Sequence, residues 1–349
     1  MTDADPAALG AAVRQLLGDS LGYLYPAALR AAVRAGVADH LATGPLPPEK
    51  LAELGGVQAD HLRRVLRFLA TRGVFREREG GDFELTTAAV LLRSDAALSL
   101  RPLVLLFTDP LCWLPTGRLE DTVRTGEAVF GEVFGSQFFD HLLTDGATNT
   151  LFCEAMATLS TIEQGPIVDS YPFPERGTVV DIGGGLGGLL HTVLARNPGL
   201  TGILLDREPV VSAARLDDPA VAGRWEAQAA DFYAEIPAGA DVYLLKRILH
   251  DKTDADCVRL LRACRRAMPA AARLLIIDPL IPVSGACPDS TRLSDVLMMA
   301  VFEGRERTEA DLAELLGEAG LAVNQVVPTP GALTILEAVP VKGGDARPR

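Results

Sequence analysis

The sequence predicts an α/β fold: a seven-stranded, mostly parallel sheet that ends in an antiparallel hairpin and follows a helical, winged-helix N-terminal part. Three observations predict it. From Gly177 onward, short β-branched or leucine-rich runs alternate with helical segments, as in strands joined by helices that cover a parallel sheet. The first run, within VVDIGGGLGGLL (179–190), ends in an acid and a glycine-rich turn. The loop between the last two runs, residues 328–331, is too short for a parallel crossover.

The composition limits the functions that the chain can serve. Its 349 residues correspond to about two domains at roughly 150 residues each, and 48% hydrophobic content allows a large core. The net charge of −13 argues against a nucleic-acid partner, which requires a basic surface. The odd number of cysteines and the absence of a CxxC pair argue against disulfides and a metal site. Without a signal-peptide pattern or a long apolar run, the chain is expected to be cytoplasmic, with no membrane partner.

The N-terminal part is expected to be helical up to residue 100, apart from one hairpin. The stretch from residue 45 to residue 86 has the pattern helix, turn, helix and short hairpin, with Gly80 and Gly81 at the tip, which is typical of a winged helix. Such a module either contacts DNA through its second helix, residues 61–71, or serves structure and dimerisation. The acidic wing favours the second interpretation; its acids are Glu77, Glu79, Asp82 and Glu84.

Residues 86–170 are expected to be helical, with aromatic side chains that form either plain core or one wall of a pocket for an apolar substrate. These aromatics are Phe107, Trp113, Phe130, Phe134, Phe138, Phe139 and Phe152.

The glycine turn leaves two cofactors open. Gly183-x-Gly185-x-x-Gly188 has the spacing of a dinucleotide site, and Asp181-x-Gly183-x-Gly185 has that of an S-adenosylmethionine site. Ligands of open α/β sheets bind outside the carboxyl ends of the strands. Those ends carry acids in the first three strands, and acids suit a sulfonium and an ammonium better than a pyrophosphate. The acids are Asp181, Asp206 and Asp231. With the terminal hairpin, they favour S-adenosylmethionine.

The order and spacing of several stretches resemble the class I S-adenosylmethionine-dependent small-molecule O-methyltransferases, among them the acetylserotonin and caffeic acid enzymes and bacterial enzymes of antibiotic pathways. The matching stretches are VVDIGGGLGG, LLDREPVV, AADFY, DVYLLKRILHD, LLIIDPLIP and DVLMMAVFEGRERTEADLAELLGEAGL. The resemblance implies a winged-helix dimerisation domain (1–100), a helical linker that contributes to the substrate pocket (101–170), a cofactor-binding methyltransferase domain (171–340) and a disordered tail (341–349).

The resemblance also implies residue roles and a homodimer that acts on an aromatic small molecule. His250 would be the general base, flanked by Asp278 and Glu306. The implied cofactor-binding residues are Asp181, Gly183, Gly185, Asp206, Asp231, Phe232 and Lys246. The expected acceptor-binding residues are Trp113, Phe152, Met156, Asp295 and Met298.

Two positions depart from the family pattern: Lys252 replaces a tryptophan after the His-Asp pair, and Asp278 replaces a longer glutamate. The alternative functions are N- or C-methylation, non-methyl chemistry on the same cofactor, a cofactor-sensing winged-helix regulator and a nicotinamide-dependent reductase.

Overall fold

The computed structural model describes residues 6–284 and 287–341. The chain forms two compact units, Met1–Pro110 and Leu111–Arg349, and each is described by itself. The predicted tail, from residue 342 onward, lies outside the described residues. No helix in the described part of the chain has both the length and the apolar character that crossing a bilayer requires.

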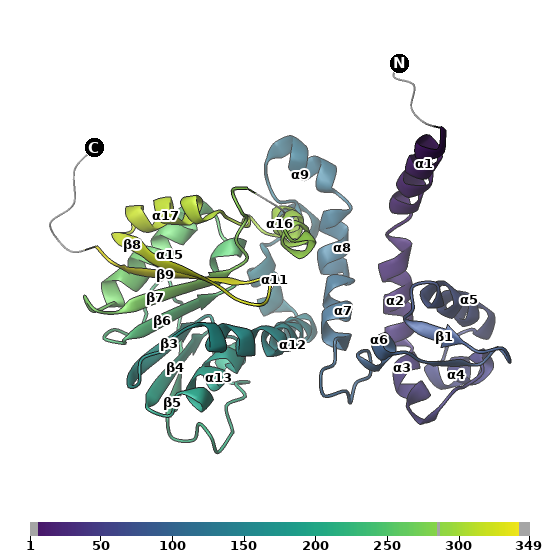
Figure 1. Cartoon of the computed structure of the whole chain (residues 1–349), viewed down its shortest axis with the longest axis horizontal. Coiled ribbons are helices and arrows are strands. Elements are labelled where there is room, and N and C mark those ends of the chain that lie inside the picture. Colours follow the sequence, from purple (N-terminus) through teal and green to yellow (C-terminus); the bar gives the residue numbers. More distant parts are fainter. Residues whose placement is uncertain (1–5, 285–286, 342–349) are drawn as a thin grey trace. The chain divides into compact units, whose positions relative to one another are not determined.

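The first unit consists of short helices around one small hairpin (Figure 1). Its strands β1 (Phe75–Glu77) and β2 (Phe83–Leu85) pair antiparallel, which confirms the predicted wing. Leu62, Leu66 and Leu69 recur at helical spacing along α5 and bury its inner face. The helices are α1 (Pro6–Ser20), α2 (Leu24–Arg34), α3 (Val37–His40), α4 (Pro48–Gly55), α5 (Ala59–Ala70), α6 (Thr87–Val90) and α7 (Arg101–Phe107), with a 3-10 turn η1 (Leu41–Thr43).

Ion pairs within the unit occupy arginines that a DNA-binding module would direct at phosphates. Arg67 Nη2 lies 2.7 Å from Glu77 Oε1 on the wing, and Arg63 pairs with Glu49. Two arginines of α5, Arg63 and Arg67, therefore make ion pairs within the module.

The second unit begins with helices that precede the sheet. These are α8 (Pro110–Thr116), α9 (Leu119–Thr125), α10 (Phe130–Phe134), α11 (Phe138–Thr144) and the long α12 (Gly146–Ser170). Asp145 caps α12, since its carboxylate accepts hydrogen bonds from the Ala147 and Thr148 amides. Phe130, Phe138, Phe139, Phe152 and Phe302 pack together in one aromatic cluster.

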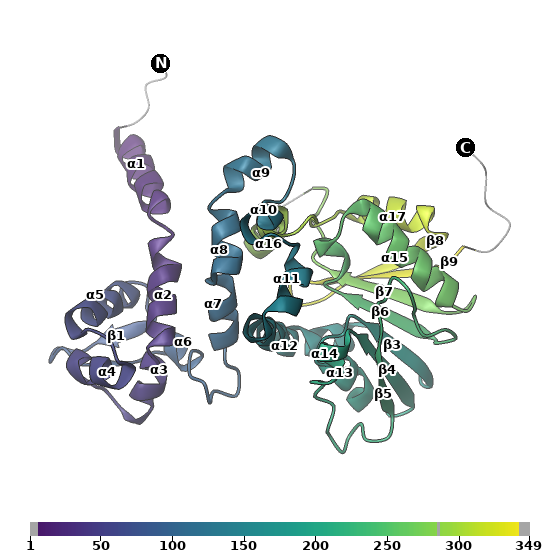
Figure 2. The same cartoon turned by 180° about the vertical axis from the view of Figure 1, so that it is seen from behind.

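The sheet has seven strands in the order β5-β4-β3-β6-β7-β9-β8 (Figure 2). The five strands β5, β4, β3, β6 and β7 run parallel, and β9 and β8 pair antiparallel at the edge, which confirms the predicted terminal hairpin. The strand order reverses between β3 and β6, where open α/β sheets bind ligands. The bounds are β3 (Gly177–Ile182), β4 (Leu200–Asp206), β5 (Trp225–Ala229), β6 (Val242–Lys246), β7 (Arg273–Asp278), β8 (Leu321–Pro328) and β9 (Thr334–Pro340).

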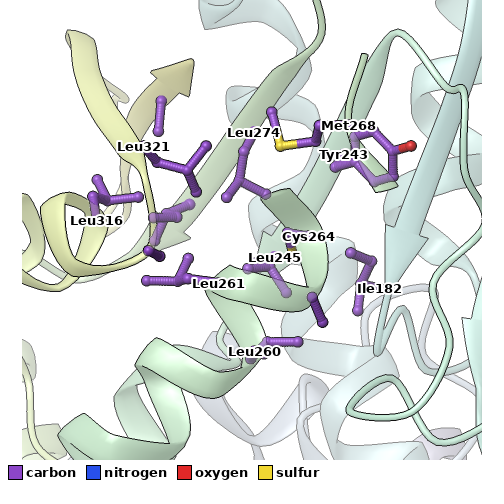
Figure 3. Packing of buried hydrophobic residues seen from close by; sticks show 14 of the residues in the cluster. Ile182, Tyr243, Leu245, Leu260, Leu261, Cys264, Met268, Leu274, Leu316 and Leu321 are labelled. Carbon is purple, nitrogen blue, oxygen red and sulfur yellow. The ribbon is translucent and has the colours of Figure 1, made fainter. Parts of the chain in front are cut away.

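The central strands are apolar on both faces because helices cover both. Along β6, Tyr243 and Leu245 pack on one side with α15 and α17, whereas Val242 and Leu244 pack on the other with α13. Figure 3 shows the first cluster, in which Leu260, Cys264 and Leu316 meet the sheet residues. The helices of this part are α13 (Gly188–Arg196), α14 (Glu208–Val211), α15 (Asp254–Ala267), α16 (Asp289–Val301) and α17 (Glu309–Glu318), with a 3-10 turn η2 (Leu249–Asp251).

Candidate functional site

The glycine turn after β3 brings backbone to the edge of a cavity. Gly183 and Gly185 have φ angles of +67° and +60°, a region that favours glycine. A Cβ on Gly183 would lie 2.6 Å from the Cδ1 atom of Ile248, so a larger residue would require the end of that side chain to move. The turn therefore brings the backbone close to the cavity at the point where β3 ends.

The Asp206 carboxylate at the end of β4 holds this turn. Its Oδ2 accepts a hydrogen bond from the Gly185 amide at 2.9 Å, and its Oδ1 accepts one from the Arg207 amide at 2.7 Å. Burial raises the pKa of Asp206 despite these bonds.

Asp181, at the end of β3, is a buried acid with an unused oxygen. Its side chain is only 1% exposed, and Oδ2 has no hydrogen-bond partner within the described residues. Burial raises the pKa of Asp181 to about 7, although the Lys246 ammonium opposes the shift. Such a carboxylate is stabilised by a ligand that brings positive charge.

A cavity of about 580 Å³ lies between these strand ends and the helices α11 and α12. On one side, the ends of the strands contribute polar groups, and Asp231 and Phe232 lie beside them in the lining. On the other side, the helices contribute apolar groups such as Phe152 and Met156. A volume of this order suits a drug-sized ligand. Other lining residues are Phe139, Asp140, Asn149, Cys153, Ala157, Asp181, Gly183, Gly185, Asp206, Arg207, Arg215, Lys246, Arg247, Ile248, Asp251 and Lys252.

A buried ion-pair cluster joins α12 to the end of β6. Glu163 Oε1 lies 2.6 Å from Arg247 Nη2, and Glu163 Oε2 lies 3.3 Å from Lys246 Nζ. Burial lowers the pKa of Lys246, with partial compensation by Glu163. Arg247 has a φ of +55°, the one positive value among the described non-glycine residues, so the chain turns sharply where it leaves the strand.

The segment after β6 presents His250 beside two carboxylates. His250 Nδ1 lies 3.0 Å from Glu306 Oε1, which also accepts a hydrogen bond from the Ser294 hydroxyl. All three charged side chains are buried: His250 is 7%, Asp278 4% and Glu306 2% exposed. Burial alone would lower the pKa of His250, but the Glu306 hydrogen bond and the charges of Asp278 and Glu306 outweigh it and raise the pKa. Burial raises the pKa of Asp278 to about 6.

The segment 304–307 packs closely against the histidine turn, η2 (Leu249–Asp251), and is hydrogen-bonded to it. A Cβ on Gly304 would overlap the backbone of this turn, so only glycine allows the close approach. Arg307 Nη1 donates to the Leu249 carbonyl at 2.6 Å, and Nη2 donates to the Lys252 carbonyl at 2.8 Å. Sequence reasoning missed these two positions; the stretch EGRERT contains them but offers no periodicity that marks their partners.

The structure brings most of the predicted site residues together. The seven predicted cofactor residues line one cavity with Phe152 and Met156, and His250, Asp278 and Glu306 form one cluster. Among the described residues that line the cavity, Trp113, Asp295 and Met298 do not occur, and neither does the histidine cluster. Asp295 instead accepts a hydrogen bond from the Glu306 amide at 3.0 Å. The roles assigned from the sequence stay predictions.

Comparison with protein families decides the class. The O-methyltransferase domain model matches residues 117–322, and the O-methyltransferase dimerisation domain model matches residues 19–95. The chain belongs to the O-methyltransferase family. It is an S-adenosylmethionine-dependent enzyme, which settles the choice between the two cofactors that the glycine spacing left open.

Relatives of this O-methyltransferase act in antibiotic biosynthesis. Phenazine O-methyltransferase PhzM of Lysobacter antibioticus is 37% identical over 322 residues, which cover 92% of this chain and 94% of the relative. The mitomycin biosynthesis 6-O-methyltransferase of Streptomyces lavendulae is 39% identical, with coverage of 91% and 92%. The crystal structure of CalO1, a methyltransferase in calicheamicin biosynthesis with bound S-adenosylhomocysteine (SAH), has a TM-score of 0.84 at 44% identity and covers 97% of this chain and 100% of CalO1.

The residues of the cavity fit this cofactor. The unpartnered Asp181 oxygen matches a cationic ligand, and the glycine turn provides close backbone approach. A pyrophosphate bound at this turn would be repelled by the carboxylates of Asp181 and Asp206.

Proposed function

We propose that this O-methyltransferase methylates an aromatic hydroxyl group of a secondary metabolite and that His250 removes the hydroxyl proton. The observation that supports this proposal is the buried contact between His250 Nδ1 and Glu306, at 3.0 Å, because it occupies Nδ1 and makes Nε2 the nitrogen that would accept the proton. The names of the relatives support the acceptor class, since phenazine is an aromatic ring system.

The proposed base meets a chemical need of this reaction. A phenol has a pKa near 10 in water, so little of it is ionised at neutral pH. An imidazole can accept the proton as the oxygen attacks, which contributes about 10²–10⁴-fold to the rate. Glu306 fixes the ring with its Nδ1 proton inward and, with Asp278, stabilises the imidazolium that forms.

We assign the cofactor to the strand ends. Asp181 and Asp206 would hold its charged and hydroxyl groups, Asp231 and Phe232 its adenine, and Gly183 the portion nearest the turn. The cofactor supplies an electrophilic methyl group on a sulfonium. The protein would contribute orientation, because a bound pair in attacking geometry reacts far faster than two free molecules.

The experiment compares the turnover and cofactor affinity of the wild type with those of His250→Ala. SAH formation is then measured with a panel of phenols and matched aryl amines as acceptors. We expect turnover to fall about 10²-fold or more, with cofactor affinity from calorimetry unchanged. Unchanged turnover would reject His250 as the base, and release of SAH only with amines would redirect the proposal to N-methylation.

The dimerisation module supports a homodimer. No residue of α1 is buried, and several of its large apolar side chains are exposed. A second copy of the same chain would cover this surface. Light scattering of the wild type should give twice the chain mass, and Leu16→Glu with Leu17→Glu should reduce it to one. The exposed side chains concerned are Leu9, Val13, Leu16 and Leu17.

A further inference from the structure

Helix α16 holds Glu306 at two points. The Ser294 hydroxyl donates a hydrogen bond to Glu306 Oε1, and the carboxylate of the next residue, Asp295, accepts one from the Glu306 amide at 3.0 Å. The amide contact fixes the backbone of Glu306, which is only 2% exposed. Two adjacent residues of one helix therefore act on the acid that contacts His250, one on its backbone and one on its charge.

The Ser294 hydroxyl shares a single carboxylate oxygen with His250. Glu306 Oε1 lies 3.0 Å from His250 Nδ1 and also accepts the Ser294 hydroxyl. Glu306 Oε2 has no hydrogen-bond partner within the described residues, so both donors depend on the negative charge at one atom. The hydroxyl hydrogen carries a partial positive charge, which weakens the attraction of Glu306 for an imidazolium at the same oxygen.

The surroundings of His250 favour a positive charge on its ring. Three acids lie near the ring: Asp278 at the end of β7, Glu306, and Asp251 in the histidine turn. Although burial opposes it, the Glu306 hydrogen bond and these negative charges raise the pKa of His250. A protonated imidazole cannot accept a proton, so too strong an attraction would disable the proposed base. Other charged or titratable groups packed around this cluster are Arg247, Lys252, Asp295, Arg305, Arg307 and Cys257.

We propose that Ser294 is a positioning residue that acts through Glu306: its hydroxyl takes up part of the carboxylate charge, so that His250 returns to the neutral form that accepts a proton. The inference rests on the proposed function, in which His250 is the general base. Because the Glu306 backbone is held separately through Asp295, removing the hydroxyl should change the charge felt by His250 and leave the carboxylate in place.

The test measures the pKa of the His250 imidazole by NMR titration of the full chain with isotope-labelled histidine. The His250 signal is assigned by its absence in His250→Ala. We expect Ser294→Ala to raise this pKa by about half a unit to one unit, the effect of one neutral hydrogen bond. Ser294→Thr keeps a hydroxyl and should titrate as the wild type does. Ser290→Ala, at an exposed position on the same helix, is the matched control and should also leave the pKa unchanged.

The pH dependence of kcat/KM separates a shared charge from a structural defect. In Ser294→Ala the rising limb should move to higher pH, which lowers kcat/KM about three- to tenfold at a given pH on the limb. The plateau at high pH should be retained. A merely structural role of Ser294 would lower the plateau and leave the limb in place.

An unchanged or lowered pKa of His250 in Ser294→Ala would overturn the inference, and so would an equal rise in Ser294→Thr or in Ser290→Ala. Ser294→Cys replaces the hydroxyl by a weak donor of similar size and should give an intermediate rise, so it decides if Ser294→Ala does not fold. A raised pKa in the titration with an unmoved kinetic limb would contradict His250 as the base, not the role of Ser294.

Discussion

Replacing Glu306 by glutamine removes one negative charge from the imidazole of His250 and keeps an oxygen for its Nδ1 proton. The two atoms lie 3.0 Å apart in a buried pair. A hydrogen bond to a charged group contributes about 1.5–3 kcal/mol, and one pKa unit corresponds to 1.36 kcal/mol. We therefore expect the pKa of His250 to fall by about one to two units, with Asp278 retaining part of the stabilisation.

The pH dependence of kcat/KM measures this pKa, because only the neutral imidazole accepts a proton. In the wild type the raised pKa of His250 places the rising limb above pH 6.5, its ordinary value. In Glu306→Gln the limb should move to lower pH and the plateau should fall, since a weaker base removes the proton less readily. Asp278→Asn is the companion variant and should shift the limb in the same direction. A limb that stays in place in a folded Glu306→Gln enzyme would refute the coupling.

Three further predictions concern the cofactor site and the histidine turn. Asp181 has a pKa of about 7, and its ionised form should bind S-adenosylmethionine best. The affinity for the cofactor should therefore be constant above pH 7 and fall by up to tenfold per pH unit below it. Calorimetry should find no such pH dependence in Asp181→Asn. Gly304→Ala should displace the turn and lower kcat by about 10²-fold, whereas Gly317→Ala, which has open space around its Cβ, should have wild-type kinetics. Arg307→Met should lower the free energy of unfolding, measured with denaturant, by about 3 kcal/mol, because two backbone carbonyls lose their donors. The more exposed Arg305→Met should lower it by less than about 1 kcal/mol. Equal losses in the two variants would contradict the role of Arg307 in holding the histidine turn.

Local patterns predicted that the residues of the proposed cofactor half would lie close together. Asp181 and Asp206 each end an apolar run, and the carboxyl ends of parallel strands meet at one edge, so strand assignment alone brings them together. The third strand ends at Ala229, slightly before the predicted Asp231, because the Asp231 carboxylate accepts the Tyr233 amide and starts a turn.

The acceptor half was less predictable because its contacts join distant segments. Glu163 lies in the long helix α12, and nothing in the neighbouring sequence indicates its partner. It pairs with Arg247, which is 84 residues away. Met298 was expected to face the acceptor, but it is 6% exposed in α16 and does not line the cavity within the described residues. Helical spacing identifies a buried face and not the object packed against it.

The pairing of Glu163 with the end of β6 has a consequence for the order of events in turnover. The same helix that carries Phe152 and Met156 is fastened through this acid to Lys246 and Arg247. A methyl donor that settles against the strand ends would stiffen the opposite wall before the acceptor arrives. We therefore expect the methyl donor to bind first, and the affinity for the acceptor should be measurably weaker when the donor is absent.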